Sequence, residues 1–336
     1  MRFVLLVAVV LVLPACPPPV VGAGCAAGCA AGCGEGCGEG EGEGEGEGEG
    51  EGEGEGEGEG EGEGEGEGEG EGGCGDVVIV GTTITNSEGL VVARDGTVFY
   101  SQPEAVGRRT PDGVVDDAWV VVAGADTLWG VMLSPDNQRL YAASPSTGSV
   151  FVIDVNDGVL AFEIPGFEGP NGLTVDAAGT LFVSDFFANA VFALDVRSSA
   201  ADTVQRTVTL QVITPNGLLV DGDDLLVLGY QGGGLHRLVG GRIGAPGAVT
   251  TEASGLGNPD GVVRAADQSL YVTDNGGGRL LHLEGGVGVQ VATGINAAAN
   301  LEFGTAPLRC DRLLVSSSQA LRVLDVGVGG AAVVWR

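Results

Sequence analysis

The stretch PNGLTVDAAGTLFVSD, residues 170–185, has five further variants along the chain, and this repetition limits what the sequence can fold into. Aligned on the small residue that follows the first polar position, the six copies are anchored at Gly89, Gly130, Gly172, Gly217, Gly261 and Asn300. The anchors are 41, 42, 45, 44 and 39 residues apart. A period of about 40 residues with several short strands in each repeat is typical of a β-propeller.

Each copy has the residue pattern of paired strands. Apolar and polar residues alternate in GLTVDA and in TLFVSD, the residues AAG between them favour a turn, and VFALDV alternates again after Asn189. Alternation with a period of two indicates strands, and no comparable helical periodicity is present. Six copies fill residues 81–336, so we predict an all-β, six-bladed β-propeller over residues 76–336.

The first 15 residues have the pattern of an export signal. After Arg2 comes the apolar run FVLLVAVVLVL, which is too short to span a bilayer and is typical of a secretory signal peptide. The run ends in Leu13-Pro14-Ala15-Cys16, which resembles the lipobox of bacterial lipoproteins, where the cysteine carries the lipid. We therefore expect an exported protein, anchored to the bacterial cell envelope by a lipid on Cys16. The alternative is an ordinary signal peptide and a secreted protein.

Residues 16–75 are expected to form a disordered linker rich in Cys, Gly and Glu. Residues 39–72 are a Glu-Gly alternation with no apolar surface to bury and with like charges that repel. Together with Glu35 this tract holds 18 carboxylates, so −13 of the formal net charge of −31 belongs to the rest of the chain. The remainder is acidic and has no basic stripe, which argues against a nucleic-acid partner.

Two cysteines lie in the expected propeller region, Cys74 before the first strand and Cys310 in the last copy. Propellers commonly close their ring by pairing an N-terminal strand with the last blade, which would bring these two positions together. Export places the chain in an oxidising compartment. We therefore expect a Cys74–Cys310 disulfide.

The residue before each anchor is expected to face the central channel, since the innermost strand of each blade begins there. In chain order the six residues are Glu88, Trp129, Asn171, Asn216, Asp260 and Ala299. All of them except Trp129 and Ala299 carry a side-chain oxygen. Asn-Gly and Asp-Gly pairs also favour turns, which is an alternative reason for their presence. Two carboxylates and two amides that converge would suit a cation with oxygen ligands, Ca²⁺ before other divalent ions.

The ordered set of motifs resembles the senescence marker protein, gluconolactonase and luciferin-regenerating enzyme family. The resemblance covers about Val77–Val326 and rests on Glu-Gly in the first copy, Pro-Asn-Gly in the third and fourth, Pro-Asp-Gly in the fifth and Phe-Gly in the sixth. It implies a six-bladed propeller with one divalent ion in its channel and hydrolysis of lactones. Carried over by motif, it implies Glu88, Asn216 and Asp260 as metal ligands and Asn171 as a contact to the metal-bound water or the substrate.

One departure from the family pattern concerns the substrate. Family lactonases that act on sugars tend to carry an arginine two residues before Asn171, and this chain has Gly169 there. Trp129 at the channel mouth indicates a less polar substrate site, or a ring that fills space. Asp260 is the candidate catalytic base.

Other polar residues are expected to be structural. Asp185 and Asp274 are expected to cap turns. His236 and His282 are expected to lie away from the channel.

Two functions fit these residues. The first is a monomeric, calcium-dependent hydrolase of a small lactone or ester. The alternative is a non-catalytic propeller at the cell envelope, in which the ion is structural and the channel mouth binds a ligand or a protein.

Overall fold

The computed structural model describes residues 87–196, 205–240 and 248–330, all within the compact unit Gly66–Arg336. These residues form six antiparallel sheets, each built from strands that follow one another in sequence. The predicted all-β, six-bladed propeller is therefore confirmed. The expected signal peptide (residues 1–15), the linker (residues 16–75) and Cys74 lie outside the described residues, so the predictions made for them stay predictions.

The first three blades have four strands each. Blade one holds β1 (Leu90–Val92), β2 (Val98–Ser101), β3 (Ala105–Arg109) and β4 (Val115–Val121). Blade two holds β5 (Val131–Leu133), β6 (Arg139–Ser144), β7 (Ser149–Asp154) and β8 (Val159–Pro165). Blade three holds β9 (Pro170–Val175), β10 (Thr180–Asp185), β11 (Ala190–Asp195) and β12 (Gln205–Gln211).

The last three blades follow the same plan. Blade four holds β13 (Pro215–Asp221), β14 (Asp224–Gly229), β15 (Gly234–Leu238) and β16 (Val249–Ala253). Blade five holds β17 (Pro259–Arg264), β18 (Leu270–Asp274), β19 (Arg279–Glu284) and β20 (Val287–Thr293). Blade six has three described strands, β21 (Leu301–Phe303), β22 (Arg312–Val315) and β23 (Arg322–Asp325). The N-terminal strand expected to complete blade six would lie outside the described residues.

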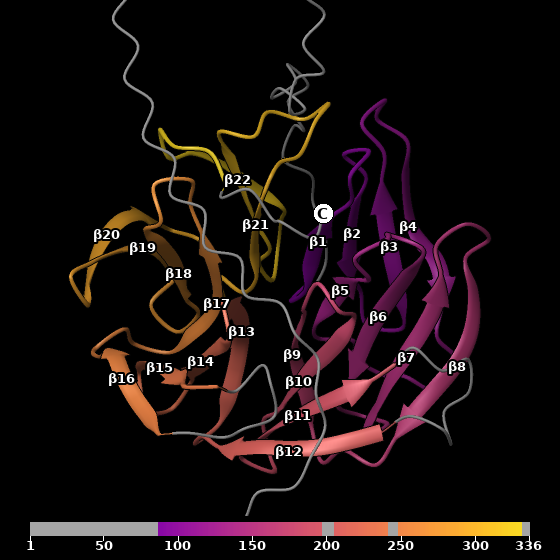
Figure 1. Ribbon diagram of the computed structural model, residues 1–336. Coiled ribbons are helices and arrows are strands. Elements are labelled where there is room, and N and C mark those ends of the chain that lie inside the picture. The colour runs from indigo at the N-terminus through magenta and orange to yellow at the C-terminus, as the bar shows by residue number, and fades with distance from the viewer. Residues whose placement is uncertain (1–86, 197–204, 241–247, 331–336) are drawn as a thin grey trace, which may run out of the picture. The chain divides into compact units, whose positions relative to one another are not determined.

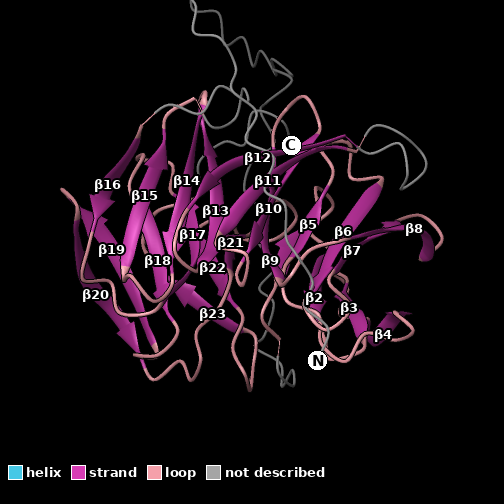
Figure 2. Ribbon diagram, turned by 90° about the horizontal axis from the view of Figure 1, so that it is seen from below, coloured by secondary structure: helices cyan, strands magenta, loops and turns pink. Residues whose placement is uncertain are grey.

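The first strands of the six blades form a closed ring. Each contacts the first strand of the next blade, in the order β1, β5, β9, β13, β17, β21 and back to β1. Figure 1 shows the blades around this ring, and Figure 2 shows them from below. One end of every innermost strand therefore meets the corresponding ends of the others, which places the predicted site at one end of the channel.

Burial within a blade falls from the channel outward. In β10 the residues Leu181–Asp185 are all buried, because the strand is packed on both faces by neighbouring blades. The turn before it is held by Asp176, whose carboxylate accepts the backbone N–H groups of Ala178 and Thr180, while Gly179 adopts a φ of 84°. The outer strand β8 is mostly exposed. Strands near the channel are thus buried on both faces, whereas the outer strand of a blade is largely exposed.

The apolar core lies between blades. One cluster joins blades one to three, others join adjacent pairs of blades, and a further one packs Leu90 and Tyr100 of blade one against Leu314 and Leu321 of blade six. This last cluster closes the ring by apolar contact. The first and last blades are therefore packed together as the other neighbouring blades are.

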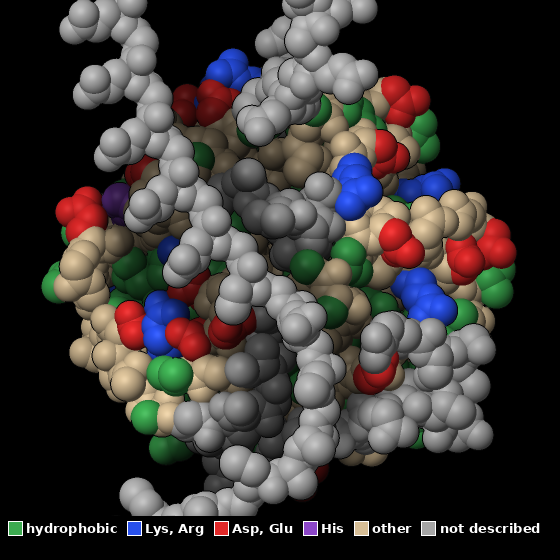
Figure 3. All heavy atoms as spheres, viewed as in Figure 1, with side chains coloured by type: hydrophobic (Ala, Val, Ile, Leu, Met, Phe, Trp, Pro, Cys, Tyr) green, Lys and Arg blue, Asp and Glu red, His purple; other side chains and the backbone are tan. Residues whose placement is uncertain are grey.

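The described surface carries charges of both signs. On the face drawn in Figure 3, basic side chains lie beside acidic ones. Arg237, for example, pairs with Asp221 at 2.7 Å and with Asp224 at 3.0 Å. Within the described residues no helix is long and apolar enough to cross a membrane.

Candidate functional site

The anchor glycines are held by hydroxyl groups at the ends of the second strands. In three blades a hydroxyl oxygen accepts the anchor N–H at 2.8 Å, in the pairs Gly89–Ser101, Gly172–Ser184 and Gly261–Thr273. Because the glycine is fixed, the residue immediately before it is fixed as well. The repeated Ser or Thr of the motif thus positions the side chain that faces the channel.

The anchors are glycines because the blades approach closely there. An added Cβ would lie 2.1 to 2.3 Å from a carbonyl oxygen of the next blade at Gly89, Gly130, Gly172 and Gly217. None of these four has a positive φ, so the requirement is for space and not for a special backbone conformation. The missing side chains let the first strands converge around a narrow channel.

Three of the predicted site residues lie inside strands. Asn171, Asn216 and Asp260 belong to β9, β13 and β17, at positions where the register with the second strand shifts. Such irregularities redirect side chains. The alternative that these Asn-Gly and Asp-Gly pairs are there to make turns is therefore wrong, because the dipeptides stand within the innermost strands.

Glu88 is fixed through its backbone at the junction of the first and last blades. Its N–H donates to Ser101 Oγ at 3.0 Å, and its carbonyl accepts the N–H of Asn300 at 3.0 Å and the hydroxyl of Ser316. Asn300 also donates from its side chain to the carbonyl of Leu90 at 3.1 Å. These contacts hold the carboxylate of Glu88 on the channel side of the ring.

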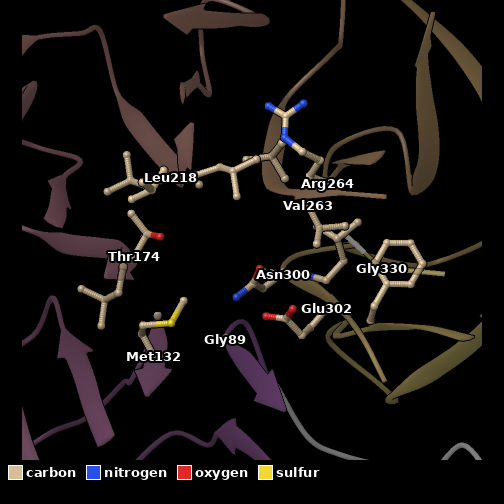
Figure 4. A pocket seen from close by; sticks show the side chains of 18 of the residues that line it. Gly89, Met132, Thr174, Leu218, Val263, Arg264, Asn300, Glu302 and Gly330 are labelled. Carbon is tan, nitrogen blue, oxygen red and sulfur yellow. Dashed lines mark hydrogen bonds between the residues drawn. The ribbon is translucent and has the colours of Figure 1, made fainter. Parts of the chain in front are cut away.

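A cavity of about 1160 Å³ brings the four predicted oxygen donors together. Glu88, Asn171, Asn216 and Asp260 all line it, and it continues along the innermost strands as far as Arg264. Its wall mixes apolar and polar side chains, and Figure 4 shows Met132 and Leu218 around the open space together with Asn300 and Glu302. All four residues therefore line one cavity, and their roles as metal ligands or substrate contacts stay predictions.

The two carboxylates at this site disfavour each other's ionisation. Burial raises the pKa of Glu88 well above its ordinary value, the neighbouring carboxylate of Asp260 raises it further, and a hydrogen bond from the Asn171 side chain opposes both. Burial raises the pKa of Asp260 to about 7, and a hydrogen bond from the Asn216 side chain opposes this. The site is thus an acidic pair, each member with an amide partner.

This set of donors suits a hard cation. Two carboxylates and two amides supply only oxygen ligands to a metal, which is the preference of Ca²⁺, with water completing its shell. In the described part of the chain no three His, Cys, Asp or Glu side chains gather into a metal cluster. Amide oxygens from Asn171 and Asn216 would therefore have to complete a site built on Glu88 and Asp260.

Trp129 lies beside the donors but does not line the cavity with them. Its ring packs against Phe186, with centroids 6.1 Å apart, and Phe187, at 6.2 Å, and Phe186 in turn meets Tyr230 at 5.6 Å. Sequence reasoning missed Phe186, Phe187 and Tyr230. Reading the residue directly after the second strand of each copy would have found Phe186 and Tyr230, since they are equivalent in neighbouring blades.

The residues expected to be structural are so. The carboxylate of Asp185 accepts the N–H groups of Glu168, Gly169 and Ala188. The carboxylate of Asp274 accepts the N–H groups of Asn258 and Gly277 and forms an ion pair with Arg279. His236 and His282 lie on the third strands β15 and β19, where His282 stacks on Tyr271. Neither histidine contributes to the channel site.

The fold and the acidic pair define a class, that of six-bladed propellers with carboxylates at the channel. Comparison with known proteins gives the following likenesses. No family model matches the chain, and no curated protein matches its sequence. Among solved structures, a luciferin-regenerating enzyme is similar with a TM-score of 0.61 and 15% identity, over 75% of this chain and 95% of that one.

Two bacterial structures are also similar. Regucalcin from Agrobacterium tumefaciens, described as a calcium-binding protein, gives a TM-score of 0.58 at 18% identity, over 74% of this chain and 92% of that one. Virginiamycin B lyase from Staphylococcus aureus gives a TM-score of 0.52 at 13% identity, over 74% of this chain and 88% of that one. Similarity at such low identity shows a shared fold, and that fold serves a luciferin-regenerating enzyme, a calcium-binding protein and a lyase.

Proposed function

We propose that this protein is a calcium-dependent hydrolase of lactones or esters. The observation that carries the proposal is the pair of carboxylates Glu88, which is partly buried, and Asp260, which is buried, brought together from blades one and five and each bonded to an amide. Two anions that interact in this way are unfavourable unless a proton or a cation lies between them. A site of this kind is costly to maintain for structure alone.

The ion would be held by Glu88, Asn216 and Asp260, with Asn171 directed at the bound water or the substrate. When bound, Ca²⁺ would supply a positive charge that polarises the ester carbonyl and stabilises the oxyanion formed when water attacks. Similarity to a regucalcin described as calcium-binding supports this choice of ion.

The chain's own residues would divide the remaining work. Glu88 is tied through its backbone to Ser101, Asn300 and Ser316, so it suits the fixed part of the site. Asp260 is 5% exposed and lies at the site, so its carboxylate is placed to accept the proton of the attacking water. The pKa of about 7 that burial gives this carboxyl belongs to the metal-free protein, and a bound cation would lower it. Asn171 would hold the water or the carbonyl oxygen by its side-chain amide.

The test compares two Asp→Asn substitutions in blade five. Asp260→Asn removes the proposed base, whereas Asp267→Asn makes the same chemical change in the exposed turn between β17 and β18, at the other end of β17 from Asp260. Hydrolysis of a panel of lactones and aryl esters is measured in Ca²⁺ and in chelator, with thermal unfolding as the check on folding. We expect turnover by the wild type and by Asp267→Asn, dependence on Ca²⁺, and loss of turnover in Asp260→Asn.

Two results would count against the proposal. Turnover retained in a folded Asp260→Asn variant would remove this residue from the mechanism. Stabilisation by Ca²⁺ with no turnover of any lactone or ester would indicate the alternative, a non-catalytic propeller with a structural ion.

We also propose that the chain is exported and held at the cell envelope as a monomer by a lipid on Cys16. This rests on the sequence Leu13-Pro14-Ala15-Cys16 after an apolar run. Incorporation of labelled fatty acid into the wild type and not into Cys16→Ser tests it. Release of an unlipidated protein into the medium would favour the ordinary signal peptide.

A further inference from the structure

Four aromatic rings from three blades form a continuous cluster at the site end of the channel. Trp129 precedes β5, Phe186 and Phe187 follow β10, and Tyr230 follows β14. Phe186 and Phe187 meet edge to face with centroids 5.4 Å apart, and the Phe186–Tyr230 contact is also edge to face. Rings in these geometries attract one another through their quadrupoles and offer the same contacts to a further ring.

The cluster adjoins the acidic pair. Trp129 directly precedes the anchor Gly130, and its carbonyl oxygen lies where a Cβ on Gly89 would be, next to Glu88. Burial, and then the charges of Asp260 and Glu88, raise the pKa of Tyr230, so its phenol lies within electrostatic range of both carboxylates. The rings therefore lie next to the carboxylates, outside the cavity that the carboxylates line.

The cluster is not ordinary core packing. Phe187 is 56% exposed, and Ile213, in the loop before β13, is 68% exposed. The two loops are tied together by a hydrogen bond from the Thr214 N–H to Asn189 Oδ1 at 2.8 Å. A ring that served only to fill space would be covered, and exposed apolar groups grouped beside a polar site are a common sign of ligand binding.

The loop that carries the two phenylalanines is held in place. The buried carboxylate of Asp185 accepts the N–H groups of Gly169 at 2.8 Å and Ala188 at 3.1 Å, and the Phe186 N–H donates to the Gly169 carbonyl at 2.8 Å. Phe187 lies directly over Gly169, where an added Cβ would be 2.3 Å from its ring. The ring is thus presented by a rigid loop and occupies the space that a side chain at residue 169 would need.

The rings of Trp129, Phe186 and Phe187 offer the hydroxyl groups of a sugar few hydrogen-bond partners. The Tyr230 hydroxyl already donates to Asn275 Oδ1 at 3.1 Å. Substrate hydroxyls placed against Trp129, Phe186 and Phe187 would lose hydrogen bonds to water without replacement, which is costly. An aromatic ring would lose none.

We infer that the ring cluster binds an aromatic group of the substrate, so that the enzyme acts on aromatic lactones or aryl esters and not on sugar lactones. This inference rests on the proposed hydrolase function. The scissile carbonyl would lie at the acidic pair, and the aromatic group would lie against Phe187 and Trp129.

The experiment uses Phe187→Ala, which should fold because the side chain is largely exposed. Leu160→Ala, at another exposed apolar position in β8, is the matched control. Hydrolysis of dihydrocoumarin is compared with hydrolysis of δ-valerolactone, which lacks the aromatic ring, and of glucono-δ-lactone. We expect Phe187→Ala to lower kcat/KM for dihydrocoumarin at least tenfold and to change that for δ-valerolactone less than twofold, with Leu160→Ala unchanged on both.

A binding measurement separates this inference from the proposed function. The affinity of 3-phenylpropanoate is measured by Trp fluorescence and by NMR for the wild type and Phe187→Ala, with Ca²⁺ present. If no lactone is hydrolysed but binding weakens tenfold in the variant, the hydrolase proposal fails and the aromatic subsite stands. Equal loss on both lactones, a preference for glucono-δ-lactone, or unchanged binding of 3-phenylpropanoate in Phe187→Ala would each overturn the inference.

Discussion

Replacing Asp260 by Asn should change how the stability of the metal-free protein depends on pH. In the folded chain the pKa of this carboxyl is raised from an ordinary value of 3.8 to about 7. Between these values the unfolded chain has lost the proton while the folded chain keeps it, so the free energy of unfolding falls as the pH rises. A shift of about 3 units at 1.36 kcal/mol each corresponds to roughly 4 kcal/mol lost between pH 4 and pH 7.

The Asn variant cannot ionise at this position and should escape that loss. It also removes the charge that helps to raise the pKa of Glu88, so the remaining carboxyl should ionise more easily. The free energy of unfolding is measured by urea denaturation in chelator from pH 4 to pH 8, for the wild type, Asp260→Asn and Asp267→Asn. Asp267 is a suitable control because a hydrogen bond from the Ser269 hydroxyl lowers its pKa, the opposite direction.

Parallel curves for the wild type and Asp260→Asn across this pH range would refute the reasoning. Such a result would mean that the carboxylate of Asp260 ionises as easily in the folded protein as in the unfolded chain. The acidic pair would then lose its status as a site that needs a cation.

Three further predictions concern the same site. Ca²⁺ at 100 times its Kd should stabilise the wild type by about 2.7 kcal/mol near pH 7.5, as measured by thermal unfolding, and should have little effect on Glu88→Gln. In Gly172→Ala the new Cβ would lie 2.3 Å from the carbonyl oxygen of Asn216, so this variant should lose about 1–3 kcal/mol of unfolding free energy. Gly232→Ala is the control, because its nearest atom is 3.8 Å away and it should lose much less. Equal losses would contradict the argument that the blades approach closely at Gly172. Ser184→Ala should cost about 1–3 kcal/mol, because the partly buried N–H of Gly172 would lose its acceptor, and a loss near zero would show that the hydroxyl does not hold the anchor.

The blade count and the four donors could be predicted because each follows from the repeat itself. One residue before each anchor was enough to find Glu88 and Asp260, since equivalent positions in a ring of blades meet at the axis. Within a single copy the same residues look like turn formers. Only the carbonyl of the neighbouring blade, which fills the space of a Cβ, explains why glycine follows Asn171.

Phe187 could not be predicted in the same way. Phe187 lies in the segment after a second strand, where the copies differ in sequence, and it has no equivalent ring in the next blade. Its contact with Trp129 depends on how two loops from neighbouring blades fold over one another. A local pattern carries no information on such a contact.

The carbonyl of Glu88 is where the first and last blades join, through Asn300 and Ser316. The seam of the ring therefore passes through the same residue that supplies one carboxylate to the channel. An ion bound by both Glu88 and Asp260 would link blade five to blade one and so stabilise the junction of the first and last blades. Loss of the ion and loosening of the ring would then be one event, with the earliest hydrogen exchange at the junction of β1 and β21.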